Sequence, residues 1–138
     1  MILKAKDFEI NEKPVEKSCL VGVYGTLKKG WGNHRLLEPL EPEDIQIEIQ
    51  GLKMYYAFPG GYPGVVLTDD NSEKVLMETY LVTPERLRRL DGLEGIPHLY
   101  RRMVLKKEIS ELEYDYIFYM YNRMINEELR IKDNIFKK

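Results

Sequence analysis

The chain has 138 residues, carries 21 Lys and Arg against 23 Asp and Glu, and has a formal net charge of −2. This length fits one domain, and the charge balance lacks the basic excess with which proteins neutralise a nucleic-acid backbone. No apolar run approaches the length of a transmembrane helix. Cys19 is the only cysteine, and with His34 and His98 it forms no recognisable zinc-ligand spacing. We therefore expect a cytoplasmic protein with no metal, cofactor, nucleic-acid partner or membrane contact.

The first part of the chain predicts an extension, a buried strand and a short helix. Residues 1–18 are rich in Lys and Glu and show little periodicity, so we expect an N-terminal extension or a peripheral strand ahead of a single domain over residues 19–138. The apolar run CLVGVY over residues 19–24 predicts a buried strand that ends at Gly25. A loop follows, after which Asn33 can cap a short helix.

The middle of the chain alternates apolar and polar residues. Over residues 45–56 this period of two predicts a long or bent strand with a break at Gly51. The turn-rich run PGGYPG then precedes a strand at residues 65–67. Residues 74–82 predict the next strand.

A helix is predicted directly after that strand. Thr83 can cap it, Pro84 fits the first helical position, and Glu85 suits the positive end of the helix dipole. The helix should run to about Leu93 and stop at Gly95.

The last part of the chain completes the predicted fold. Residues 100–109 and 113–123 predict two more strands, and the tail after Asn122 predicts a last helix. Strands and short helices without regular βαβ alternation favour an α+β domain with a mixed or barrel-like sheet and helices around its rim.

The first candidate for chemistry is the loop formed by Tyr24, Gly25, Thr26 and Leu27. A strand runs straight into a glycine turn here, which leaves consecutive backbone N–H groups available at a strand end. Such groups can bind an anion. The alternative is an ordinary strand exit without a ligand.

The second candidate is Glu94, at the end of the predicted helix. Helical spacing places its carboxylate on the same stripe as two leucines that the helix should bury. An acid is also unfavourable at the negative end of a helix. These departures from local preference mark a candidate general acid/base. The alternative is a structural ion pair of Glu94 or Asp91 with Arg101 or Arg102.

The third candidate lies in the tyrosine-rich last strand. A period of two places Ile117, Tyr119 and Tyr121 on one face of the sheet. Most of these rings belong in the core. Tyr121 lies next to the polar Asn122 and is the best placed to bring a hydroxyl to a pocket.

Two motifs resemble those of a known family. The run VYGTLKKG at residues 23–30, with NHR at residues 33–35, resembles the opening motif of the gamma-glutamylamine cyclotransferases and their AIG2-like bacterial and plant relatives. The run LDGLEG at residues 90–95, with LYRR at residues 99–102, resembles their second motif, and GGYPGVV lies between the two. The chain is therefore identified as a member of the gamma-glutamyl cyclotransferase family over about residues 20–123.

The resemblance implies a fold and a site. The fold is a small mixed β-barrel with short peripheral helices and a pocket at one end. Glu94 would be the acid/base and Tyr121 a tyrosine of the pocket wall. The substrate-binding loop would consist of Tyr24, Gly25, Thr26 and Leu27. Met77 stands where relatives usually carry glycine, which bears on the shape of the pocket wall.

The resemblance also implies an activity, the release of 5-oxoproline from a gamma-glutamyl amine or gamma-glutamyl amino acid. The α-amine of such a substrate attacks its own side-chain carbonyl, so the enzyme needs a carboxylate that moves protons but no nucleophile or metal of its own. The leaving amine stays open. Two alternatives also remain, a non-catalytic sensor of a small ligand and a structural protein. We expect a monomer or a weak homodimer.

Overall fold

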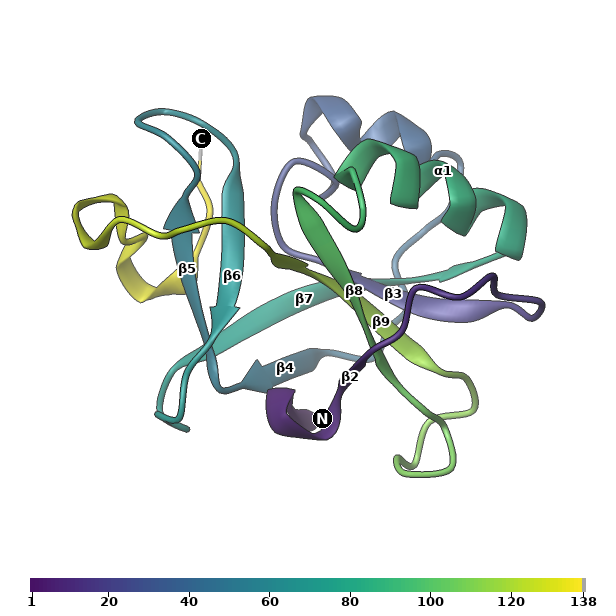
Figure 1. Cartoon of the computed structure of the whole chain (residues 1–138). Coiled ribbons are helices and arrows are strands. Elements are labelled where there is room, and N and C mark those ends of the chain that lie inside the picture. The colour runs from purple at the N-terminus through teal and green to yellow at the C-terminus, as the bar shows by residue number, and fades with distance from the viewer. Residues whose placement is uncertain (138) are drawn as a thin grey trace.

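A curled, mixed β-sheet dominates the fold in the computed structural model, which describes residues 1–137. Its seven strands and a separate two-stranded hairpin are shown in Figure 1. In sheet order the strands are β1 (Ile2–Lys4), β4 (Ile47–Gln50), β7 (Lys74–Val82), β3 (Cys19–Val23), β9 (Tyr116–Tyr121), β8 (Tyr100–Leu105) and β2 (Glu9–Ile10). The hairpin consists of β5 (Leu52–Tyr56) and β6 (Pro63–Leu67).

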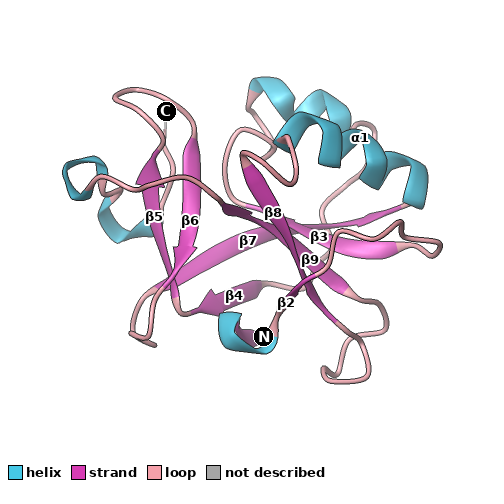
Figure 2. Cartoon of the chain, in the orientation of Figure 1, coloured by secondary structure: helices cyan, strands magenta, loops and turns pink. Residues whose placement is uncertain are grey.

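Strand β3 lies at the centre of the sheet. It pairs antiparallel with β7, with Val21 opposite Tyr80, and parallel with β9, with Val21 opposite Ile117. The β5–β6 hairpin packs against β9 and β7, and the α-helix and the 3-10 helix at Gly32–Leu36 lie together at the other end of the sheet (Figure 2). The predicted α+β class with a mixed, barrel-like sheet and short helices at its rim is therefore confirmed.

The one α-helix described, α1 (Pro84–Glu94), forms where its local signals place it. The Thr83 side chain accepts a hydrogen bond from the Arg86 N–H, so it caps the first turn as predicted. Gly95 ends the helix in the left-handed conformation that glycine adopts without strain. No described helix has the length and apolar character needed to cross a membrane.

The sheet separates two apolar clusters, as the alternation along β9 predicts. Ile117, Tyr119 and Tyr121 face the cluster under α1, and Tyr116 and Phe118 face the opposite one. Because β3 and β9 are buried on both faces, they read as nearly continuous apolar runs.

The N-terminal segment contributes to the sheet. β1 pairs parallel with β4, and β2 pairs antiparallel with β8, so the first ten residues form both edge strands. Within this segment the side chains of Leu3, Ala5 and Phe8 are buried. The segment expected as an extension or peripheral strand thus supplies part of the core.

Several predicted elements differ in the structure. Asn33 caps no α-helix, because residues Gly32–Leu36 form a 3-10 helix after Trp31 and the Asn33 amide bonds Thr26 instead. The predicted last helix is also wrong. The tail forms two short 3-10 turns, Glu127–Leu129 and Lys132–Asn134, that lie along β5.

Further differences concern the lengths of predicted strands. The expected strand over residues 45–56 is divided at Gly51 into β4 and β5, which belong to different sheets. The last two strands are also shorter than predicted. β8 ends at Leu105, and β9 begins at Tyr116.

Candidate active site

A cavity of about 270 Å³ opens where β3 ends. Its walls come from the loop after β3, the end of α1, the start of β6, and strands β8 and β9. The residues that the following paragraphs use are Tyr24, Gly25, Thr26, Leu27, Tyr62, Pro63, Glu94, Tyr100 and Tyr119. Both motifs singled out in the sequence therefore meet at one cavity, although about seventy residues separate them.

Glu94 is the last residue of α1 and the only charged side chain that lines this cavity among the described residues. It is half-buried and makes no hydrogen bond or ion pair with any of residues 1–137. Burial, reinforced by the negative charge of Asp91, raises the pKa of Glu94 to about 7. Both protonation states are therefore accessible near neutral pH, as a group that accepts and returns a proton requires.

Asp91, one turn before Glu94, makes the structural ion pair. Its carboxylate accepts hydrogen bonds from Arg102 Nη1 at 2.6 Å and from the Tyr119 hydroxyl at 2.6 Å. Arg102 is buried and also donates to the carbonyl oxygens of Asn11 and Lys13. Burial raises the pKa of Asp91 although these hydrogen bonds oppose the shift.

The arginine pairing considered for Glu94 is therefore absent among the residues that the structure describes. Arg101 pairs instead with Glu12, with Nη2 and Oε1 2.7 Å apart.

The loop after β3 presents unpaired backbone donors. None of the N–H groups of Gly25, Thr26 and Leu27 donates a hydrogen bond to another described residue. The loop is held from outside, since the Lys29 N–H donates to Glu78 and the Asn33 amide donates to the Thr26 hydroxyl. Three free N–H groups at a fixed strand end suit a carboxylate or a developing oxyanion.

Two tyrosines fix the cavity wall. The Tyr24 hydroxyl donates to the Tyr119 carbonyl at 2.7 Å, which ties the loop to β9. The Tyr100 hydroxyl donates to the Pro63 carbonyl at 2.6 Å, which ties β8 to the start of β6. Gly25 allows this close assembly, because a Cβ atom there would lie 2.6 Å from Cγ of Pro63.

The structure brings five of the six predicted site residues to the cavity, namely Glu94, Tyr24, Gly25, Thr26 and Leu27. It does not bring Tyr121. The β5–β6 hairpin packs Gly64 against the Tyr121 ring, whose centroid lies 5.5 Å from that of Tyr100. Tyr121 is therefore a core residue, and the expectation that it lines the pocket is not met.

The sequence reasoning missed Tyr100 and Tyr119 as cavity residues. Tyr119 shares its strand face with Tyr121, so the period of two could have indicated it. Met77 also differs from expectation. It lies outside the cavity, in a separate hollow on the other side of Tyr24. Among residues 1–137, no group of three His, Cys, Asp or Glu side chains is arranged to hold a metal ion.

Comparison with known proteins shows the family and agrees with the fold. The family described as "Gamma-glutamyl cyclotransferase, AIG2-like" matches residues 21–137, and the chain belongs to this family. A human relative, gamma-glutamylaminecyclotransferase, is 35% identical over 98 residues, which cover 67% of this chain and 64% of the relative. The match thus spans less than two thirds of the human protein.

Two solved structures share the fold. An uncharacterised protein of Pyrococcus horikoshii superimposes with a TM-score of 0.64 at 22% identity and covers 85% of this chain and 88% of its own. An AIG2-like protein of Mus musculus gives a TM-score of 0.55 at 22% identity, with 82% of each chain covered. At this level of identity the likeness concerns the fold alone.

Proposed function

We propose that the chain is a cyclotransferase that releases 5-oxoproline from a gamma-glutamyl amine or gamma-glutamyl amino acid. The observation that carries the proposal is the unpaired Glu94 carboxyl group in the same cavity as the free N–H groups of the loop after β3. Membership of the family and the name of the human relative support the reaction class.

Glu94 acts as the general acid/base in this proposal. As a carboxylate it takes a proton from the α-ammonium group of the substrate, and the freed amine attacks the γ-carbonyl carbon. A new C–N bond closes the five-membered ring. Glu94 then returns the proton to the departing nitrogen while the original amide C–N bond breaks. The ring nitrogen loses a second proton, which the released amine takes up, so the products are 5-oxoproline and an ammonium ion, and no water is consumed.

The N–H groups of Gly25, Thr26 and Leu27 bind the negative charge of the substrate in this mechanism. Their position at the end of β3 suits the α-carboxylate or the oxyanion that forms when the amine attacks the carbonyl. Because the hydrogen bond from Tyr24 to Tyr119 and the one from Asn33 to Thr26 fix the loop, these donors need little rearrangement during the reaction.

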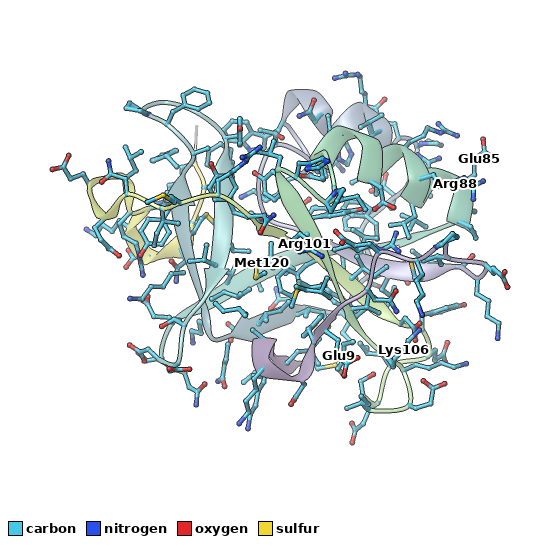
Figure 3. All side chains as sticks on the ribbon, in the orientation of Figure 1. Glu9, Glu85, Arg88, Arg101, Lys106 and Met120 are labelled. Carbon is cyan, nitrogen blue, oxygen red and sulfur yellow. The ribbon has the colours of Figure 1, made fainter. Side chains whose placement is uncertain are left out.

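The experiment is Glu94→Gln, which keeps the size of the side chain and removes its ability to move a proton. We expect 5-oxoproline release to fall by about two to four orders of magnitude. The matched control is Glu85→Gln on the same helix. Glu85 lies at the outer end of α1 and points away from the molecule (Figure 3), so its turnover should equal that of the wild type.

Each outcome separates the proposal from its alternatives. A folded Glu94→Gln protein with undiminished turnover contradicts the role of Glu94. A wild-type protein that binds gamma-glutamyl compounds in calorimetry, yet releases no 5-oxoproline from any of them, is instead the sensor considered from the sequence.

A further inference from the structure

A second hollow of about 490 Å³ adjoins the Glu94 cavity. The two share Thr26 and Tyr62 in their linings, so the hollow is a direct neighbour of the cavity. The hollow lies between the tip of the β5–β6 hairpin and the C-terminal end of the chain, which run side by side in Figure 1.

Four of the eight described residues that line the hollow are aromatic. The rings of Trp31 and Phe136 are stacked, with centroids 4.4 Å apart and an interplanar angle of 28°. Tyr56 meets Phe136 edge to face at 6.1 Å, and Tyr62 completes the lining on the side of the cavity. Four rings from separate segments thus surround one space beside the proposed reaction centre.

The C-terminal segment is held in place by polar contacts, so the hollow is preformed. The Asn134 side chain accepts a hydrogen bond from the Met54 N–H at 2.9 Å and donates to the Leu52 carbonyl. Lys28 Nζ donates to the Phe136 carbonyl at 3.0 Å, which ties the segment to the substrate loop. The Phe136 ring is therefore fixed relative to the loop that carries Thr26.

The size of the cavity indicates what the hollow holds. Small-molecule sites usually occupy roughly 300–1,000 Å³, and the Glu94 cavity lies just below this range. It has room for a gamma-glutamyl group but little for a bulky leaving group. A leaving group attached to the γ-carbonyl must therefore extend beyond the cavity, and the hollow that shares Thr26 and Tyr62 with it is an adjoining space.

The charge of the hollow limits the chemistry of its occupant. Among residues 1–137, Lys137 is the only charged side chain of the hollow, and no carboxylate of these residues lines it. A leaving group with a second positive charge would therefore face Lys137 and no carboxylate from the described residues. A flat, uncharged ring instead gains contact with four aromatic side chains.

We propose that this hollow binds the leaving group and that the protein prefers gamma-glutamyl compounds whose leaving amine carries an aromatic ring. The inference rests on the proposed cyclotransferase activity. It assigns Trp31, Tyr56 and Phe136, in the hollow that shares Thr26 with the Glu94 cavity, as residues that determine specificity.

The test compares kcat/KM for three synthetic substrates: gamma-glutamyl benzylamide, gamma-glutamyl methylamide and the gamma-glutamyl derivative of 1,4-diaminobutane. We expect the benzylamide to exceed each of the others by about tenfold or more. In Trp31→Leu and Phe136→Leu, which keep apolar volume and remove the ring, the ratio of benzylamide to methylamide should fall severalfold. Tyr114→Leu is the control, because this half-buried ring lies outside both spaces, and its ratio should match the wild type.

Binding provides a second readout. In the Glu94→Gln background, calorimetry should show that the benzylamide binds more tightly than the methylamide, and that Phe136→Leu removes the difference.

Equal kcat/KM for benzylamide and methylamide in the wild type overturns the inference alone, because 5-oxoproline release still supports the activity. The inference is also overturned if the ratio of benzylamide to methylamide is unchanged in Trp31→Leu and Phe136→Leu but falls in Leu93→Ser. In that case the leaving group lies along α1 and not in the hollow. No 5-oxoproline from any substrate overturns the proposed activity and this inference with it.

Discussion

Two acids one turn apart on α1 occupy opposite environments. Asp91 accepts hydrogen bonds from Arg102 and Tyr119, whereas Glu94 has no such partner among residues 1–137. Environment, rather than residue type, therefore gives one carboxylate a structural ion pair and leaves the other suited to the proton transfer that we propose. The sequence indicated Glu94 as the candidate acid/base but left open which of the two acids pairs with an arginine, because Arg102 and Tyr119 reach Asp91 only after the sheet has formed.

The half-buried Glu94 carboxylate should lower the free energy of unfolding at high pH. The variant Glu94→Gln should remove this effect. The folded-state pKa of Glu94 is about 7 and exceeds the ordinary value of 4.5. Between these values the folded state binds more protons than the unfolded state, so the contribution of Glu94 to stability falls as pH rises through this window. We expect Glu94→Gln to match the wild type near pH 5 and to be more stable by roughly 1 to 3 kcal/mol near pH 8.

Urea denaturation at both pH values measures this difference. Glu85→Gln serves as the control, because Glu85 is exposed and its pair with Arg89 lies on the surface. Equal stability of Glu94→Gln and the wild type at pH 8 would show that the burial of Glu94 costs little.

At the scale of elements, the sequence predicted correctly those helices and strands whose bounds depend on neighbouring residues. The cap at Thr83, the proline after it and the glycine at the helix end define α1 without reference to the rest of the chain. β7 has the bounds that its alternation predicts. The helix predicted after Asn122 was wrong because the contacts of this segment are with residues far away in the sequence. Asn134 bonds backbone groups of β5 that lie about eighty residues earlier, and no pattern within the tail indicates this.

Gly25→Ala should distort the junction of β3 and β6. The new Cβ atom would lie 2.6 Å from Cγ of Pro63, and a proline ring cannot rotate away from it. We expect a loss of about 1 to 3 kcal/mol in the free energy of unfolding, as for other overpacked sites. Release of 5-oxoproline should fall as well, because the shift moves the cavity wall and the hydrogen bond between Tyr100 and Pro63.

Gly92→Ala is the matched control. A Cβ atom at Gly92 meets nothing within 4 Å, and alanine favours a helix more than glycine does. This variant should gain up to about 1 kcal/mol and keep wild-type turnover. If Gly25→Ala behaves in the same way, the close contact with Pro63 does not position the site.

At the scale of the whole molecule, the N-terminal segment connects the two edges of the sheet with the hydrogen bonds around Arg102. Its composition did not indicate this role. β1 and β2 lie at opposite edges of the sheet, and the next residues reach the site network, where the carbonyl oxygens of Asn11 and Lys13 accept hydrogen bonds from Arg102. The sequence of this segment lacks periodicity because its strands are only three and two residues long. Pattern reasoning therefore could not place it.

Phe8→Ala should destabilise the whole domain. Phe8 is 6% exposed, and its ring meets those of Phe118 and Tyr116 edge to face at 4.9 and 6.2 Å. Loss of such a ring from a core typically costs about 3 to 5 kcal/mol. Denaturant unfolding measures the loss. Phe58→Ala, which removes a ring that is 51% exposed, should cost well under about 1 kcal/mol. Similar costs for the two variants would contradict the assignment of Phe8 to the core.

The position of the first ten residues also bears on self-association. An exposed strand edge is a template on which another chain can add, and long flat edges invite aggregation. Here the sheet ends on both sides in strands of three and two residues, and these carry the charged side chains of Lys4 and Glu9. Without them, β4 and β8 would become the edges, and both are longer. The first ten residues thus protect both edges of the sheet from pairing with a strand of another molecule.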